Sequence, residues 1–88
     1  MVAVNRESII QAIRDAQEVR YSHGRNNGKG GVTTVDIIDR LLADVSYLDS
    51  DIYKIVKREV RTLLGQMVKD RTLSVMPYAY EGWYTVRG

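Results

Sequence analysis

The sequence predicts a mainly helical α+β domain, in which three helices are followed by a C-terminal two-stranded β-hairpin. Apolar residues recur at the three-to-four spacing of an amphipathic helix in three segments, about 5–21, 34–45 and 51–70. After Arg71 apolar and polar residues alternate, which is the period of a strand, over about 72–87. With 88 residues, 44% of them hydrophobic and 27% charged, the chain has the size and composition of one globular domain.

The first helix is expected to begin after Asn5, whose side chain can cap it. Its predicted buried stripe consists of Ile9, Ile10, Ala12, Ile13, Ala16 and Val19. Residues 22–31 contain four of the seven glycines and no apolar residue, so this segment is predicted to be an exposed loop.

A very short strand is predicted at Val32 and Thr33, directly before the second helix. Thr33 or Thr34 can cap that helix, and Asp36 lies near its positive end. The predicted buried stripe consists of Val35, Ile38, Leu41, Leu42 and Val45.

The third helix is predicted to start at a capping cluster of Asp49, Ser50 and Asp51. Its expected core residues are Ile52, Val56, Val60, Leu63, Leu64 and Met67. Gly65 destabilises a helix interior by about 1 kcal/mol relative to alanine, so a close packing contact is expected there.

In the hairpin, Leu73 and Val75 are expected to share one face of the first strand, and Tyr84 and Val86 one face of the second. The chain is expected to turn between Pro77 and Gly82.

This order of helix, brief strand, helix, helix and hairpin resembles the winged helix-turn-helix family. The stretch VTTVDIIDRLL resembles the first strand of that fold and the first helix of its motif, and Val60, Leu64 and Met67 match the end of a recognition helix. Arg71 stands where many members carry glycine before the wing. The resemblance implies a transcriptional regulator that inserts its third helix into the major groove of DNA, with the hairpin touching the adjacent backbone or minor groove.

The net charge of +2 is unevenly distributed. Residues 1–32 hold five basic and three acidic side chains, residues 33–49 hold one and four, and residues 50–88 hold seven and four. Local fields steer partners, so this segregation favours a surface that meets an anion. Chance unevenness in a small domain is the alternative.

Four cations supply that surface in the third helix. At about 100° per residue, Lys54, Lys57, Arg58 and Arg61 fall opposite the predicted core, while Glu59 falls toward the buried side. Such cations can neutralise phosphates, and Arg58 or Arg61 can also bind a guanine edge. An ordinary solvated helix face is the alternative interpretation.

Other candidate contacts flank this helix. Arg71 lies at the entry to the hairpin, and Arg25 and Lys29 in the glycine-rich loop can reach the DNA backbone, unless that loop is simply flexible. Near the hairpin tip, Tyr78, Tyr80 and Trp83 form an aromatic cluster. Packing of Trp83 against the domain or a second subunit is preferred over stacking on DNA.

Catalytic and cofactor sites are not indicated. The loop GRNNGKGG has three residues between Gly24 and Gly28 where a P-loop needs four, and it follows a helix rather than a strand. With one histidine and no cysteine, neither a zinc site nor a nucleophilic triad has a suitable pattern. We therefore expect no enzyme activity, no cofactor and no metal.

The function predicted from the sequence is sequence-specific binding of double-stranded DNA by a cytoplasmic homodimer without a membrane segment. The alternative is a winged-helix protein-interaction module that uses the acidic second helix and the aromatic hairpin. It is favoured by Asp36, Asp39 and Asp44, which would be unfavourable next to phosphates.

Overall fold

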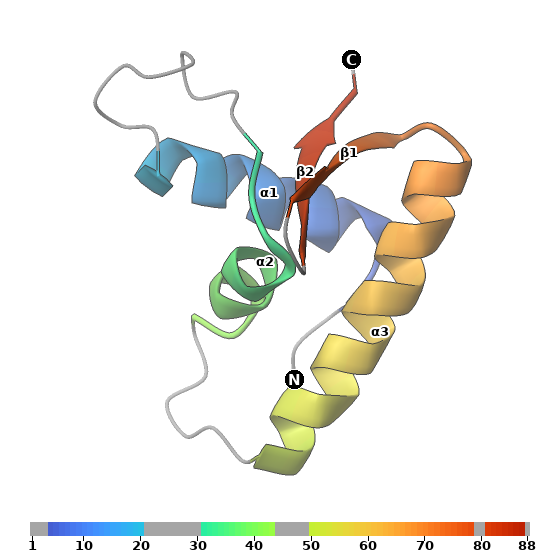
Figure 1. Cartoon of the computed structure of the whole chain (residues 1–88). Helices are drawn as coiled ribbons and strands as arrows, with labels where there is room; N and C mark the ends of the chain where they lie inside the picture. The colour runs from blue at the N-terminus through green and yellow to red at the C-terminus, as the bar shows by residue number, and fades with distance from the viewer. Residues whose placement is uncertain (1–3, 21–30, 44–49, 79–80, 88) are drawn as a thin grey trace.

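A computed structural model describes residues 4–20, 31–43, 50–78 and 81–87. Its elements are helices α1 (Arg6–Arg20), α2 (Thr34–Leu41) and α3 (Ser50–Lys69), followed by strands β1 (Leu73–Tyr78) and β2 (Glu81–Val86) (Figure 1). The predicted α+β, mainly helical class with three helices and an antiparallel hairpin is confirmed. Within the described residues, the helices and strands follow one another in the order predicted from the sequence.

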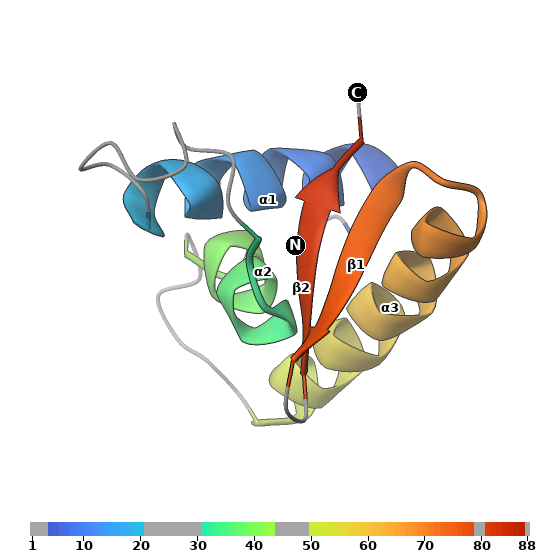
Figure 2. The same cartoon turned by 45° about the horizontal axis from the view of Figure 1, so that its top comes forward.

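One hydrophobic core joins all three helices to the hairpin. Figure 2 shows the hairpin between α2 and α3, with α1 running across one end of both. The largest fully buried side chains are Ile9, Ile13, Val32, Ile37, Ile38, Val60, Leu64, Met67 and Leu73. Tyr84 and Val86 of β2 pack against this core, so one face of the hairpin covers it.

Helix α1 begins as predicted. The Ser8 N–H donates to Asn5 Oδ1 at 2.8 Å, and the Asn5 N–H donates to Ser8 Oγ at 2.9 Å. Placing Val19 in the core was wrong, because its side chain is 64% exposed while Gln17 is buried. Val19 lies about 90° around the helix from the centre of the buried stripe, at its edge.

Val32 forms the predicted short strand. Its N–H donates to the Tyr84 carbonyl at 3.0 Å, and the Tyr84 N–H donates to the Val32 carbonyl at 2.8 Å. The preceding Gly31 has no room for a side chain, since a Cβ there would lie 2.7 Å from Trp83 Cβ. Val32 therefore pairs with β2 on the edge opposite to β1.

The hairpin has the predicted facing but a shorter turn. Leu73 pairs with Val86 and Val75 with Tyr84, so these four residues share one face of the hairpin. Leu73, Tyr84 and Val86 lie in or against the core, whereas Val75, nearer the tip, is 36% exposed. Pairing continues to Tyr78 and Glu81, so the turn expected to start at Pro77 was too long. Proline is tolerated there because β1 pairs only with β2 among the described strands.

Helix α2 is capped by Thr33. The Asp36 N–H donates to Thr33 Oγ1 at 3.2 Å, and the Thr33 N–H donates to the Asp36 carboxylate at 3.1 Å. The helix ends at Leu41 rather than 45, and Ala43 closes a tight turn onto Arg40. The predicted stripe was wrong at its start, because Val35 is 43% exposed and Ile37 is buried instead.

Helix α3 matches its predicted bounds within one residue, but its buried face is narrower than expected. Val56, Val60, Leu64 and Met67 are buried and Leu63 is half-buried. Ile52 is 41% exposed, and Glu59 is exposed, so placing both toward the core was wrong. The close packing contact expected at Gly65 is also wrong, since a Cβ there would meet nothing within 4 Å.

The end of α3 is closed by a Schellman motif. The Thr72 N–H donates to the Met67 carbonyl at 2.8 Å and the Arg71 N–H to the Val68 carbonyl at 3.1 Å. Arg71 therefore occupies the position after the cap with a φ of 68°, the left-handed conformation that glycine adopts most easily.

A small polar network joins this end of α3 to the start of α1. Arg6 Nη2 lies 2.7 Å from Asp70 Oδ2 and donates to Thr72 Oγ1 at 2.8 Å. The Thr72 hydroxyl donates to Asp70 Oδ1 at 2.6 Å, and the Thr72 N–H donates to the same oxygen at 3.0 Å. The Thr72 and Arg6 hydrogen bonds hold the pKa of the Asp70 carboxyl below its usual range.

Replacing Gly31 and Gly65 with alanine should change the free energy of unfolding in opposite directions. Gly31→Ala should lower the free energy of unfolding by about 1–3 kcal/mol, because the new methyl would clash with Trp83. Gly65→Ala should raise it by about 1 kcal/mol, since the helix gains propensity and the methyl meets no atom. Urea unfolding measures both. Equal changes in the two variants would contradict the close approach at Gly31.

Asp70 predicts a change in acid stability. Because its folded pKa is lowered, its stabilising contribution is present above the usual aspartate pKa and is lost as pH falls through the folded value. Asp70→Asn should therefore flatten the fall in melting temperature below about pH 4. Asp39→Asn, at an exposed position of α2, is the matched control. If the melting temperature of Asp70→Asn falls in acid as steeply as that of the unchanged protein, the network does not contribute to acid stability.

Candidate nucleic-acid interface

The N-terminal half of α3 is exposed around most of its circumference. Across residues 50–59 only Val56 is buried, and Tyr53 and Lys57 are half-buried. In Figure 1 this half extends away from α1 and beyond the hairpin. A helix that buries little of its own surface has that surface available for a partner.

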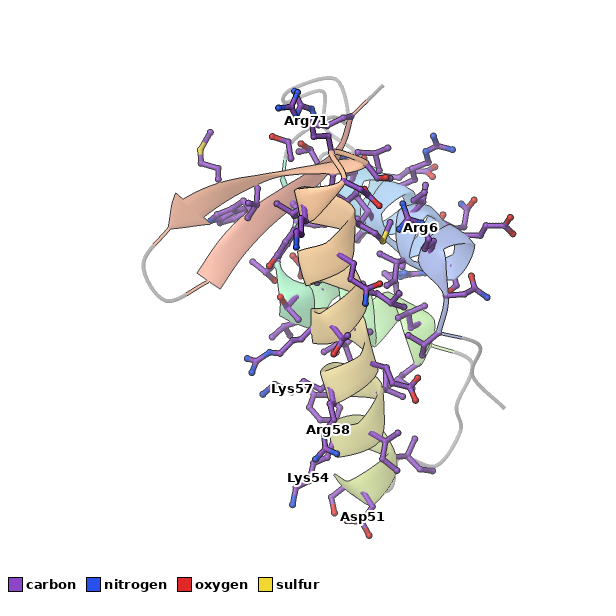
Figure 3. All side chains as sticks on the ribbon, turned by 90° about the vertical axis from the view of Figure 1, so that its right-hand side faces the viewer. Arg6, Asp51, Lys54, Lys57, Arg58 and Arg71 are labelled. Carbon is purple, nitrogen blue, oxygen red and sulfur yellow. The ribbon has the colours of Figure 1, made fainter. Side chains whose placement is uncertain are left out.

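The four predicted cations lie together on this helix. Figure 3 shows Lys54, Lys57 and Arg58 projecting from one side of α3. These three, with Arg61 and Thr62, line an open hollow in the helix surface. Lys54, Arg58 and Arg61 are exposed, as the helical spacing predicted.

These four cations are separate from the Arg6–Asp70 ion pair. The ion pair found within the described chain joins Arg6 to Asp70, and Figure 3 shows Arg6 on the opposite side of α3. Asp51 and Glu59 are the described carboxylates of α3, and the four cations outnumber them, so this side of the helix is net positive. A concentration of cations raises the local concentration of anions.

The hairpin projects toward the same side as the cations. In Figure 3, β1 and β2 extend from the upper part of α3 to the side on which Lys54 and Lys57 lie. Trp83 on β2 is half-buried, and its Cβ lies close to Gly31. The side chain of Tyr78, and Tyr80, Arg25 and Lys29 as whole residues, lie outside the described part of the structure.

Of the three aspartates in and near α2, Asp36 and Asp39 lie among the described residues. The Asp36 carboxylate accepts the Thr33 N–H within the cap of α2, which gives it a structural role. Asp39 is exposed, and Asp44 lies outside the described residues.

Four exposed residues of α3 were not among the site residues predicted from the sequence. Ile52 and Ile55 are 41% and 57% exposed, and Thr62 lines the hollow. Lys69 continues the basic side into the last turn. A helical wheel places Ile55 and Thr62 outside the predicted buried face. The exposure of Ile52, which the same wheel places on that face, is seen only in the structure.

Arg71 is the most conformationally restricted of the candidate residues. It is exposed, carries a positive φ of 68° and stands at the junction between α3 and β1. A residue other than glycine in this region is destabilising by about 1 kcal/mol or more. Its presence keeps a cation at the base of the hairpin (Figure 3).

Other site chemistry is not seen in the described residues. In those ranges, no three His, Asp or Glu side chains come together in a group able to hold a metal ion. None of the described helices combines the length and apolarity needed to cross a bilayer. Comparisons with protein-family models, curated proteins and solved structures find no match to this chain.

Replacing Arg71 with glycine should stabilise the fold. Arg71→Gly removes the side-chain penalty at φ 68° and should raise the free energy of unfolding by about 1 kcal/mol. Arg71→Ala, which removes the cation but keeps a Cβ, is the matched control and should not stabilise. Urea unfolding of both variants gives the comparison, and equal stabilities would show that the left-handed position is not strained.

Proposed function

We propose that this protein binds double-stranded DNA by inserting α3 into the major groove, in the manner of a winged helix-turn-helix transcriptional regulator. The observation that carries the proposal is the cluster of Lys54, Lys57, Arg58 and Arg61 around an open hollow on α3. Cations so arranged match the phosphates that flank a groove, and phosphate contacts supply most of the affinity of such proteins.

The dimensions of α3 suit this role. A helix with its side chains is about 10–12 Å across, close to the roughly 12 Å width of the major groove. The N-terminal half of α3 presents exposed side chains over most of its circumference, so base edges can be reached without unfolding. Arg58 or Arg61 can bind guanine, and the exposed Ile55, about 60° around the helix from Arg58, can contact a thymine methyl group.

The arrangement around α3 supports the winged-helix assignment. The Val32 pairing with Tyr84 sets a short strand beside the hairpin and ahead of α2. The hairpin and the basic side of α3 point the same way (Figure 3). In this geometry the hairpin would meet the backbone next to the groove that α3 occupies, with Arg71 at its base.

A homodimer is part of the proposal. One small module buries about 600–1,000 Å² on DNA, less than the 1,000–2,500 Å² of most specific interfaces. Two copies related by a two-fold axis would bind half-sites one helical turn apart.

A protein-interaction module is the second candidate function. An exposed apolar side chain on the hairpin favours it, since Met76 is 70% exposed. Methionine is enriched at the contact faces of protein partners, and the exposed Asp39 of α2 is a second, separate candidate contact.

Removing single cations tests the DNA proposal. Arg58→Ala and Arg61→Ala should each weaken binding to duplex DNA about tenfold and reduce the slope of log K against log salt by about one. Arg14→Ala, an exposed arginine of α1, is the matched control and should bind nearly as the unchanged protein does. Fluorescence anisotropy over a range of salt concentrations measures both quantities.

Two results would contradict DNA binding. One is the absence of duplex binding at low salt, and the other is an affinity that does not depend on salt. Either result, combined with self-association or with capture of a protein partner that Met76→Ser abolishes, would favour the interaction module.

A further inference from the structure

Gly65 has no role inside the protein that accounts for it. It lies in the middle of the C-terminal half of α3, it is exposed, and a Cβ there would meet no atom within 4 Å. Its φ is not in the left-handed region, so the backbone does not require glycine. Glycine is thus destabilising here by about 1 kcal/mol with no compensating contact among the described residues.

Gly65 lies on the same side of α3 as the cations. Lys54, Arg58, Arg61, Gly65 and Lys69 follow one another at intervals of four, three, four and four residues. These intervals place all five on one side of α3. Gly65 is therefore a gap in a basic row, one turn or about 6 Å along the axis from a cation on either side.

This gap lets a partner reach the helix backbone. Any side chain at residue 65 would hold the partner away from α3 by at least the width of a methyl group, whereas glycine does not. The two neighbouring charges, Arg61 and Lys69, are both exposed and have no ion pair within the described chain. The gap is therefore bordered by positive charge and open to solvent.

A phosphate suits this gap better than a base edge. Gly65 has no side-chain donor or acceptor, and backbone groups in a helix interior are already hydrogen-bonded to one another. The neighbouring Thr62 hydroxyl donates to the Arg58 carbonyl at 3.0 Å, so its proton is engaged. Charge is what the surroundings offer, and charge selects an anion without reading sequence.

We propose that the gap at Gly65 receives a backbone phosphate of duplex DNA, held between Arg61 and Lys69. The inference rests on the proposed function and goes further by naming the part of the nucleic acid that lies against the C-terminal half of α3. The helix would approach the DNA strand more closely at Gly65 than at any other position of the row.

Substitution of Gly65 separates stability from binding. Gly65→Ala should unfold at a higher temperature than the unchanged protein and yet bind random-sequence duplex about threefold more weakly, and Gly65→Gln should bind at least about tenfold more weakly. Neither variant removes a charge, but each would move a phosphate away from Arg61 and Lys69, so the salt slope should become shallower, as it should in Arg61→Ala. Gln66→Ala changes an exposed neighbour about 100° around the helix and is the control, with unchanged binding expected.

Different results remove different parts of the proposal. If the unchanged protein binds duplex and Arg61→Ala weakens it, but Gly65→Gln binds equally well, the phosphate site is overturned while DNA binding stands. If Gly65→Gln weakens binding to one duplex sequence and not to others, the contact is to a base and the phosphate assignment is wrong. If the unchanged protein binds no duplex at low salt, the proposed function and the phosphate site are both lost.

Discussion

Three consecutive residues, 31–33, hold the architecture together. Gly31 lies against Trp83, Val32 exchanges two backbone hydrogen bonds with Tyr84, and Thr33 caps α2. The hairpin comes about fifty residues later in the chain, so these contacts close a long loop whose entropy the fold must overcome. Because strand pairing and helix capping occur at adjacent residues, the position of the hairpin and the start of α2 are determined together.

Two residues near the C-terminal end of α3 make the fold less stable than an alternative residue would. Gly65 lies within the helix without an internal contact, and Arg71, after the helix cap, adopts a left-handed conformation that glycine would adopt more easily. Strained or unfavourable residues concentrate where a protein meets its ligand. In the DNA-binding proposal, both positions serve the same surface: the glycine permits close approach, and the arginine supplies charge at the base of the hairpin.

Much of the fold could be predicted from local patterns because each element is locally determined. The Asn5 and Thr33 caps form as the sequence indicates, and the change of period after Arg71 marks the hairpin. The errors lie at the edges of the helices: Val19, Val35 and Ile52 are apolar but exposed. Periodicity identifies an apolar face, but the width of the face that is buried depends on what packs against it.

The sequence by itself determined the order of the elements, their caps and the row of cations in α3, since these follow from spacing along one chain segment. Tertiary structure alone decided which of these features are available to a partner. The exposure of Ile52 and Ile55 and the missing contact at Gly65 depend on segments distant in sequence. Burial and charge compensation are properties of the assembled surface, and no single segment carries them.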